Sequence, residues 1–172
     1  ILGVGLTGKT QTVLVLILVA LMGGFGIIGI VSGKMNYSNF SPFAPYGAKS
    51  FFPALAYGTY AYMGTVTLAT SGSECKNPKD LPKGLVLASL TFLIMYTLAM
   101  IAMFGILHYT EMGVLESPFV AAAQRAFGPA TGVIVNFAAW LAAATCLLGG
   151  TFYSAPRTLY AMAKEGVLPE SL

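Results

Sequence analysis

The sequence predicts an all-α protein that crosses a membrane several times. Of its 172 residues, 56% are hydrophobic and 9% are charged, whereas a soluble domain has about 25% charged residues. The charges are bunched, and they leave four uncharged stretches of 24, 24, 27 and 31 residues after positions 9, 49, 83 and 125. A helix of about 24 residues rises about 36 Å, which is enough to cross a hydrocarbon core of about 30 Å.

The same composition excludes several other classes of protein. A soluble globular domain and a disordered segment would both carry more charge. The net charge of +3 is too small and too scattered for a phosphate-binding face, so we expect no nucleic-acid partner. The chain begins at Ile1 and has no secretory signal pattern, and we expect it to be a fragment of a longer protein.

The predicted spans cover about residues 10–33, 50–73, 84–107 and 131–156, within a single membrane segment that takes in residues 1–172. The first and third spans are plainly apolar and have the pattern of scaffold helices. The first is rich in glycine, and Gly29 and Gly33 form a GxxxG pair. We favour ordinary close packing of helices there, with a pocket wall at Gly23 and Gly26 as the alternative.

The second span is different, because it is aromatic, hydroxylated and interrupted by glycine. Gly58 and Gly64 enclose Tyr60 and Tyr62 and mark a place where a helix breaks at little cost. Inside a membrane, free backbone groups are tolerated only beside protein or water. The N-terminus of the second half-helix would suit a carboxylate, as in transporters that hold zwitterionic substrates. Aromatic packing within a tight bundle explains the same residues equally well.

Basic residues predict the orientation of the spans. Alternate ends of the spans hold six basic residues on one side and three on the other. The positive-inside rule therefore predicts a multi-pass protein of the cell membrane whose N-terminal end and loop near residues 74–84 face the cytoplasm.

Two local patterns lie near the fourth span. Ser117 and Pro118 suit the first positions of a short helix that runs to about Ala126, too short to span and placed at the outer interface. Lys164, Gly166 and Pro169 have the spacing of a helix stop.

Residues suited to catalysis are scarce, so we expect no enzyme, no metal site and no cofactor. The interiors of the spans hold no Asp, Glu, Lys or Arg. His108 is the single histidine, and we interpret it as an interfacial ring beside Tyr109. Asn136 is the one amide of the fourth span, and we expect it to hydrogen-bond to a neighbouring helix.

Three motifs, in order along the chain, resemble those of amino acid permeases of the amino acid–polyamine–organocation superfamily. Residues 61–64 read AYMG and are followed by SECKNP at 73–78 and LPKG at 81–84, which is similar to the sixth helix and the loop after it. Residues 117–120 read SPFV, and residues 157–169 read RTLYAMAKEGVLP, which resembles the cytoplasmic end of the eighth helix.

This resemblance covers essentially the whole chain as helices five to eight. It implies part of a LeuT-like fold of inverted repeats, here four transmembrane helices plus the short outer helix. Complete relatives have about twelve helices, so the partners of this segment would be the remaining helices, the lipid bilayer and an amino acid substrate.

The resemblance also implies which residues bind substrate. Tyr60 falls where relatives have an aromatic side chain that closes over the substrate, and Ala61 and Tyr62 follow it. The backbone of the unwound turn would meet the amino and carboxylate groups of the substrate. That turn would comprise Met63, Gly64 and Thr65, and Thr151 would face the pocket from the eighth helix.

Two departures from the family pattern concern ion coupling. Val66 stands where many relatives have an acidic residue, and Leu18 is nearest to a lysine that some proton-coupled relatives carry. A coupling proton or sodium ion would therefore bind mainly in the missing half. We predict secondary active transport of amino acids by alternating access, with neutral substrates preferred. The alternatives are a polyamine or organic-cation permease of the same fold, and a non-transporting membrane scaffold segment.

Overall fold

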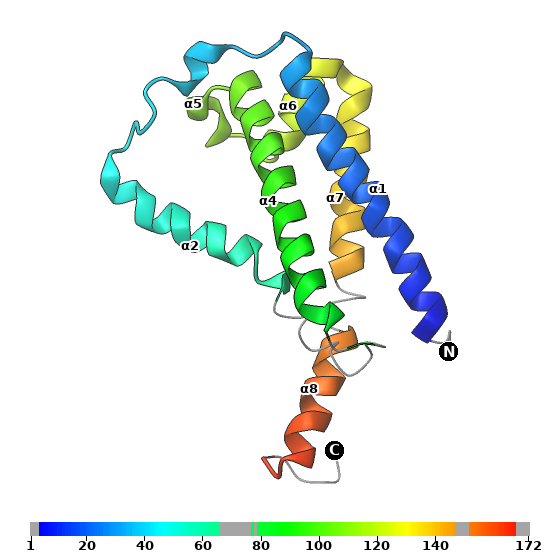
Figure 1. Ribbon diagram of the computed structural model, residues 1–172. Helices are drawn as coiled ribbons and strands as arrows, with labels where there is room; N and C mark the ends of the chain where they lie inside the picture. The colour runs from blue at the N-terminus through cyan, green and yellow to red at the C-terminus, as the bar shows by residue number, and fades with distance from the viewer. Residues whose placement is uncertain (1–3, 66–76, 78, 147–151, 168–172) are drawn as a thin grey trace.

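The computed structural model describes residues 4–65, 77, 79–146 and 152–167, and this part of the chain is helical and contains no strand (Figure 1). In chain order the elements are α1 (Val4–Val31), η1 (Tyr37–Phe40), η2 (Ala48–Ser50), α2 (Phe51–Ala61), α4 (Asp80–Ile106), α5 (Tyr109–Met112), α6 (Pro118–Phe127), α7 (Pro129–Cys146) and α8 (Phe152–Lys164).

Three of the described helices are long and apolar enough to cross a membrane, namely α1 from Lys9 onward, α4 and α7. Their 28, 27 and 18 residues correspond to about 42, 40 and 27 Å of helix. This confirms an all-helical, multi-pass membrane segment. The second predicted span is helical from Phe51 to Ala61, and positions 66–73 lie outside the described residues. Of the fourth predicted span, α7 covers the part up to Cys146 and α8 begins at Phe152, and positions 147–151 lie outside the described residues.

Glycine lets α1 lie directly against α4. Gly23, Gly26 and Gly29 are buried along one face of α1. A Cβ atom on Gly26 would lie 2.9 Å from the Leu98 Cβ and 3.1 Å from the Ala99 backbone nitrogen, and one on Gly29 would lie 2.8 Å from the Ala102 Cβ. The expected small-residue packing is therefore present, and it occupies Gly23 and Gly26, for which a pocket wall was the alternative.

The predicted GxxxG pair is wrong in its second member. Gly33 lies beyond the end of α1 with a φ of +68°, and no atom lies within 4 Å of the position a Cβ would take. Glycine is favoured there because other residues rarely adopt this backbone conformation. The packing glycines of α1 are instead spaced by three residues.

A hydrophobic core closes one end of the bundle, where α6 packs against α4 and α7 (Figure 1). The Phe25 ring of α1 makes edge contacts with Phe119 and Phe127 of α6, with ring centroids 5.7 and 6.4 Å apart. Beneath them lie buried residues of the α4 end and of α6, namely Met103, Ile106, Leu107, Ala122 and Ala126.

The short helix predicted from residue 117 is confirmed as α6. Ser117 occupies the N-cap and Pro118 the first turn, although the Ser117 hydroxyl makes no capping bond. The Ser117 carbonyl instead accepts a hydrogen bond from the Ala121 N–H at 3.1 Å. The apolar face of α6 packs against α1 and the end of α4, so this helix closes one end of the bundle.

The predicted stop of α8 is also present. The Val167 N–H donates to the Met162 carbonyl at 2.9 Å and the Gly166 N–H to the Ala163 carbonyl at 3.0 Å. With Gly166 at a φ of +74°, this is a Schellman C-cap, in which glycine adopts the left-handed conformation. Pro169 lies outside the described residues.

Gly26→Ala should weaken the contact between α1 and α4. The added methyl group meets the backbone of α4 at about 3 Å, and we expect a loss of about 1–3 kcal/mol in the free energy of unfolding. Gly24→Ala is the matched control, because nothing lies within 4 Å of its added Cβ. Thermal unfolding of the detergent-solubilised full-length protein measures both, and equal melting temperatures for the two variants would contradict the packing described.

Candidate functional site

The α-helical hydrogen bonding of α2 stops at Ala61, inside the interval where the sequence predicts a break. Tyr62, the C-cap, has φ and ψ angles of −100° and 0°. Its N–H donates to the Thr59 carbonyl and the Met63 N–H donates to the Tyr60 carbonyl, both at 3.1 Å. These bonds reach back three residues where an α-helix reaches back four, so the helix tightens and ends here.

A turn over residues 62–65 follows directly, and its last two residues, Gly64 and Thr65, are again helical. The Tyr62 carbonyl accepts two hydrogen bonds from Thr65, one from its N–H at 3.1 Å and one from its hydroxyl at 2.8 Å. The Thr65 side chain thus helps to close the turn. Its hydroxyl supplies a hydrogen bond to a backbone carbonyl at the end of α2, where carbonyls commonly need partners from outside the helix.

The predicted substrate-binding residues lie consecutively at this helix end. Tyr60 and Met63 are exposed, with 74% and 59% of their surface accessible. Ala61 and Gly64 are also exposed, whereas Tyr62 and Thr65 are partly buried. The six residues from Tyr60 to Thr65 thus form one continuous stretch at the end of α2. Thr151, the predicted contribution of the eighth helix, lies outside the described residues.

An aromatic cluster links this helix end to α4. The Tyr62 and Tyr96 rings meet edge to face with centroids 5.9 Å apart, and Phe92 stacks on Tyr96 with centroids 6.2 Å apart and planes 18° apart. Tyr96 belongs to none of the motifs that predict the site from the sequence. The spacing of Phe92 and Tyr96, four residues apart on one helix, is the signal that places both rings on the same face of α4.

A second link joins α1 to the end of α7. The Gln11 side-chain amide donates to the Thr145 carbonyl at 3.2 Å. Thr145 is buried, and its hydroxyl donates to the Ala142 carbonyl at 2.8 Å. The sequence predicted an interhelical amide bond at Asn136, and the amide that bonds to another helix among the described residues is that of Gln11. Asn136 is exposed on α7 and makes no side-chain hydrogen bond to another described residue.

Comparison with known proteins decides the family. A family model described as "Amino acid permease" matches residues 1–172. The chain belongs to the amino acid permease family. No solved structure matches the chain.

Several relatives of this permease segment are transporters by name. This chain is 30% identical over 121 residues to the amino-acid permease RocE of Bacillus subtilis. The matched region covers 70% of this chain and 26% of RocE. It is 28% identical over 126 residues to the D-serine/D-alanine/glycine transporter of Escherichia coli, covering 73% of the chain and 27% of that protein. It is 29% identical over 127 residues to the branched-chain amino acid permease BcaP of Bacillus subtilis, again covering 73% of the chain and 27% of the relative. The matched part thus spans about a quarter of the length of these relatives.

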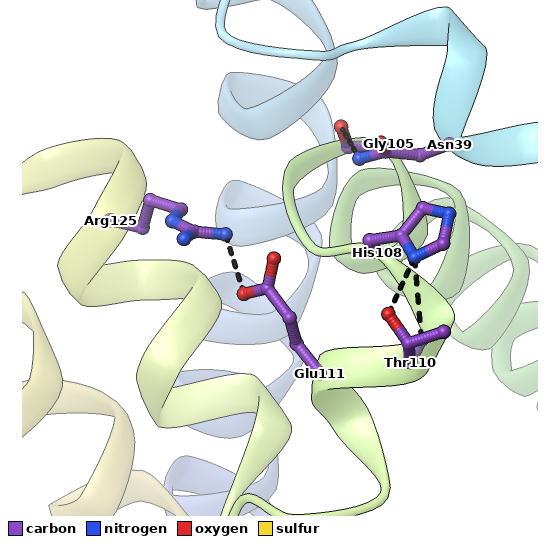
Figure 2. A network of polar contacts seen from close by, with 6 residues as sticks. All are labelled: Asn39, Gly105, His108, Thr110, Glu111 and Arg125. Carbon is purple, nitrogen blue, oxygen red and sulfur yellow. Dashed lines mark hydrogen bonds and ion pairs between the residues drawn. The ribbon is translucent and has the colours of Figure 1, made fainter.

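The other concentration of polar groups in the permease segment lies at the α6 end of the bundle (Figure 2). The Gly105 carbonyl, at the end of α4, accepts hydrogen bonds from the Asn36 N–H at 2.8 Å and the Asn39 side-chain amide at 3.1 Å. Glu111 and Arg125 form an ion pair at 2.9 Å that joins α5 to α6. These bonds hold the connecting segments against the helix ends.

His108 lies in the same region, where it has a structural role. It caps α5, where its Nδ1 lies 2.8 Å from the Thr110 hydroxyl (Figure 2). Its ring lies beside Tyr109, with centroids 4.3 Å apart, as predicted. Among the described residues, no group of three or more His, Cys, Asp or Glu side chains is placed to hold a metal ion.

Arg125→Gln should change stability only slightly. The Arg125 and Glu111 side chains are 55% and 46% exposed, and exposed ion pairs contribute at most about 1 kcal/mol. We expect a small drop in melting temperature of the full-length permease at low salt, which disappears at about 1 M salt because of screening. Lys34→Gln, which removes a cation outside the pair, is the control. A large loss that persists at high salt would show that the pair acts as a buried interaction.

Proposed function

We propose that the permease containing this segment carries amino acids across the membrane by secondary active transport with alternating access. Membership of the amino acid permease family supports the class of cargo. The observation that carries the location of the site is the end of α2 at Ala61, followed by the turn over residues 62–65.

The chemistry of a helix end suits the two charged groups of an amino acid. Where a membrane helix is interrupted, the carbonyls at the end of the first half carry partial negative charge and the N–H groups at the start of the second half carry partial positive charge. Residues Met63 to Thr65 would therefore meet the ammonium and carboxylate groups of the substrate. Tyr60 would close over it, and Thr151 would form part of the opposite wall.

The range of relatives fits recognition through the backbone. Those named for their substrates include transporters of D-serine, D-alanine and glycine, of branched-chain amino acids and of γ-aminobutyric acid. These molecules share an amino group and a carboxylate and differ in the rest of the molecule. We propose that the interrupted helix recognises the shared groups, and that surrounding side chains select among substrates.

The proposal places the segment as helices five to eight of a LeuT-like inverted-repeat fold of about twelve helices. Basic residues favour a cytoplasmic location for the N-terminal end and for the loop near residues 74–84. The interiors of the predicted spans hold no acidic or basic residue. A coupling proton or sodium ion would therefore be bound chiefly by the other helices of the permease.

Tyr60→Ala should impair uptake and leave the amount of permease in the membrane unchanged. Loss of the ring that covers the substrate should reduce transport about 10- to 100-fold, as expected when positioning in a site is lost. The measurement is radiolabelled uptake into liposomes that hold equal amounts of full-length permease. Leu55→Ala removes another exposed side chain of α2 and serves as the control. Unchanged transport by the Tyr60 variant would remove its assignment as a gate.

Neutral amino acids should compete for uptake better than basic ones. Val66 stands at a position where an acidic side chain would favour cationic substrates, because a nearby opposite charge stabilises a cation in a site of low dielectric. Counterflow uptake with a panel of amino acids, under imposed proton or sodium gradients, measures both preference and coupling. Inhibition mainly by arginine, lysine or polyamines would overturn the proposed preference, and no uptake of any member would favour a scaffold.

A further inference from the structure

Tyr96 lies on α4 in a position that nothing in the family motifs singles out. Its ring is partly buried, with Phe92 stacked on one side and the edge-to-face Tyr62 ring on another. Tyr62 is at the same time the residue at which α2 ends. One aromatic contact therefore joins the interruption of α2 to the middle of a long helix.

The remainder of α2 projects away from the bundle (Figure 1). Its main packing contact is with η2, the short helix directly before it. Phe51, Phe52, Leu55, Tyr57 and Tyr60 of this helix are all more than half exposed. Within the described residues, the Tyr62–Tyr96 ring contact therefore links the turn over residues 62–65 to α4.

Helix α4 is well suited to hold such a contact, because it is itself fixed. Leu98, Ala99 and Ala102 lie directly against the glycine face of α1. Tyr96 lies in the same stretch of α4, two residues before Leu98. The backbone that carries Tyr96 is therefore held by the packing of its neighbours against α1.

We infer that Tyr96 is a positioning residue of the substrate site. The Tyr62 ring packs edge to face against the Tyr96 ring, and this contact determines where the backbone of Met63 to Thr65 lies. This inference rests on the proposed function, since it concerns the same site. It assigns Tyr96 no contact with the substrate. Its effect on binding passes through Tyr62.

The test uses the full-length permease in liposomes and compares Tyr96→Leu with Tyr96→Phe. An aromatic pair contributes an interaction equivalent to about a 2- to 12-fold change in an equilibrium constant. Tyr96→Leu should therefore raise KM for amino acid uptake by about that factor, with little change in the maximal rate, while Tyr96→Phe keeps the ring and restores wild-type KM. A KM unchanged in Tyr96→Leu, or a loss confined to the maximal rate, would overturn the inference.

The pair should also behave as one unit. Tyr62→Leu should raise KM by a factor similar to that of Tyr96→Leu. The double variant should have a KM no higher than that of either single variant. Leu93→Ala, at a half-exposed position of α4, is the control and should leave KM unchanged. Multiplication of the two single effects in the double variant would contradict a shared contact.

A labelling measurement separates this inference from the proposed function. In a permease whose native cysteines are replaced by alanine, a cysteine introduced by Met63→Cys reports the exposure of the turn to a polar maleimide. Its labelling rate should change about 2- to 12-fold in the Tyr96→Leu background and stay the same with Tyr96→Phe. A changed rate in a protein without uptake would sustain the positioning role and refute the transport proposal. An unchanged rate would refute the positioning role itself.

Discussion

The close contact between the glycine face of α1 and α4 organises most of the described structure. Because Gly26 has no side chain, the backbone of α4 comes within about 3 Å of the place a Cβ would occupy. In a membrane, helices gain little from the hydrophobic effect on meeting one another, so such close packing and interhelical hydrogen bonds must hold them together. The other elements then attach to α4 along its length. Tyr96 meets the end of α2, Gly105 accepts bonds from the segment around η1, and Met103 packs beneath α6.

The same membrane setting explains why the end of α2 is significant. A helix satisfies its backbone internally, and an interruption leaves donors and acceptors that lipid cannot satisfy. The chain meets part of this requirement locally, since Thr65 donates twice to the Tyr62 carbonyl. Because the predicted span interiors hold no acidic or basic residue, the polar partners available there are backbone groups, hydroxyls and the amides of Gln11 and Asn136. These are the kinds of group that the proposed site for a zwitterion would use.

Sequence patterns with a short physical range predicted structure well. Ser117 with Pro118, and Lys164 with Gly166, specify helix ends within one turn, and both ends are present. Patterns that depend on a partner helix were less reliable. Gly33 lies beyond the end of α1 and takes no part in packing. An amide joins two helices at Gln11 and not at Asn136, where one was expected. A single glycine or amide does not reveal which neighbour it will face.

By itself, the sequence predicted the class of protein, because largely apolar stretches without charge, 24 to 31 residues long, are long enough to cross a bilayer as helices. It also located the interruption of the second span, since glycine and aromatic residues there weaken a continuous helix. Only the tertiary structure decided which glycines face α4 and that Tyr62 meets Tyr96. Those contacts join residues far apart in the chain, and their choice depends on how two helices are rotated and shifted against each other, which no local pattern records.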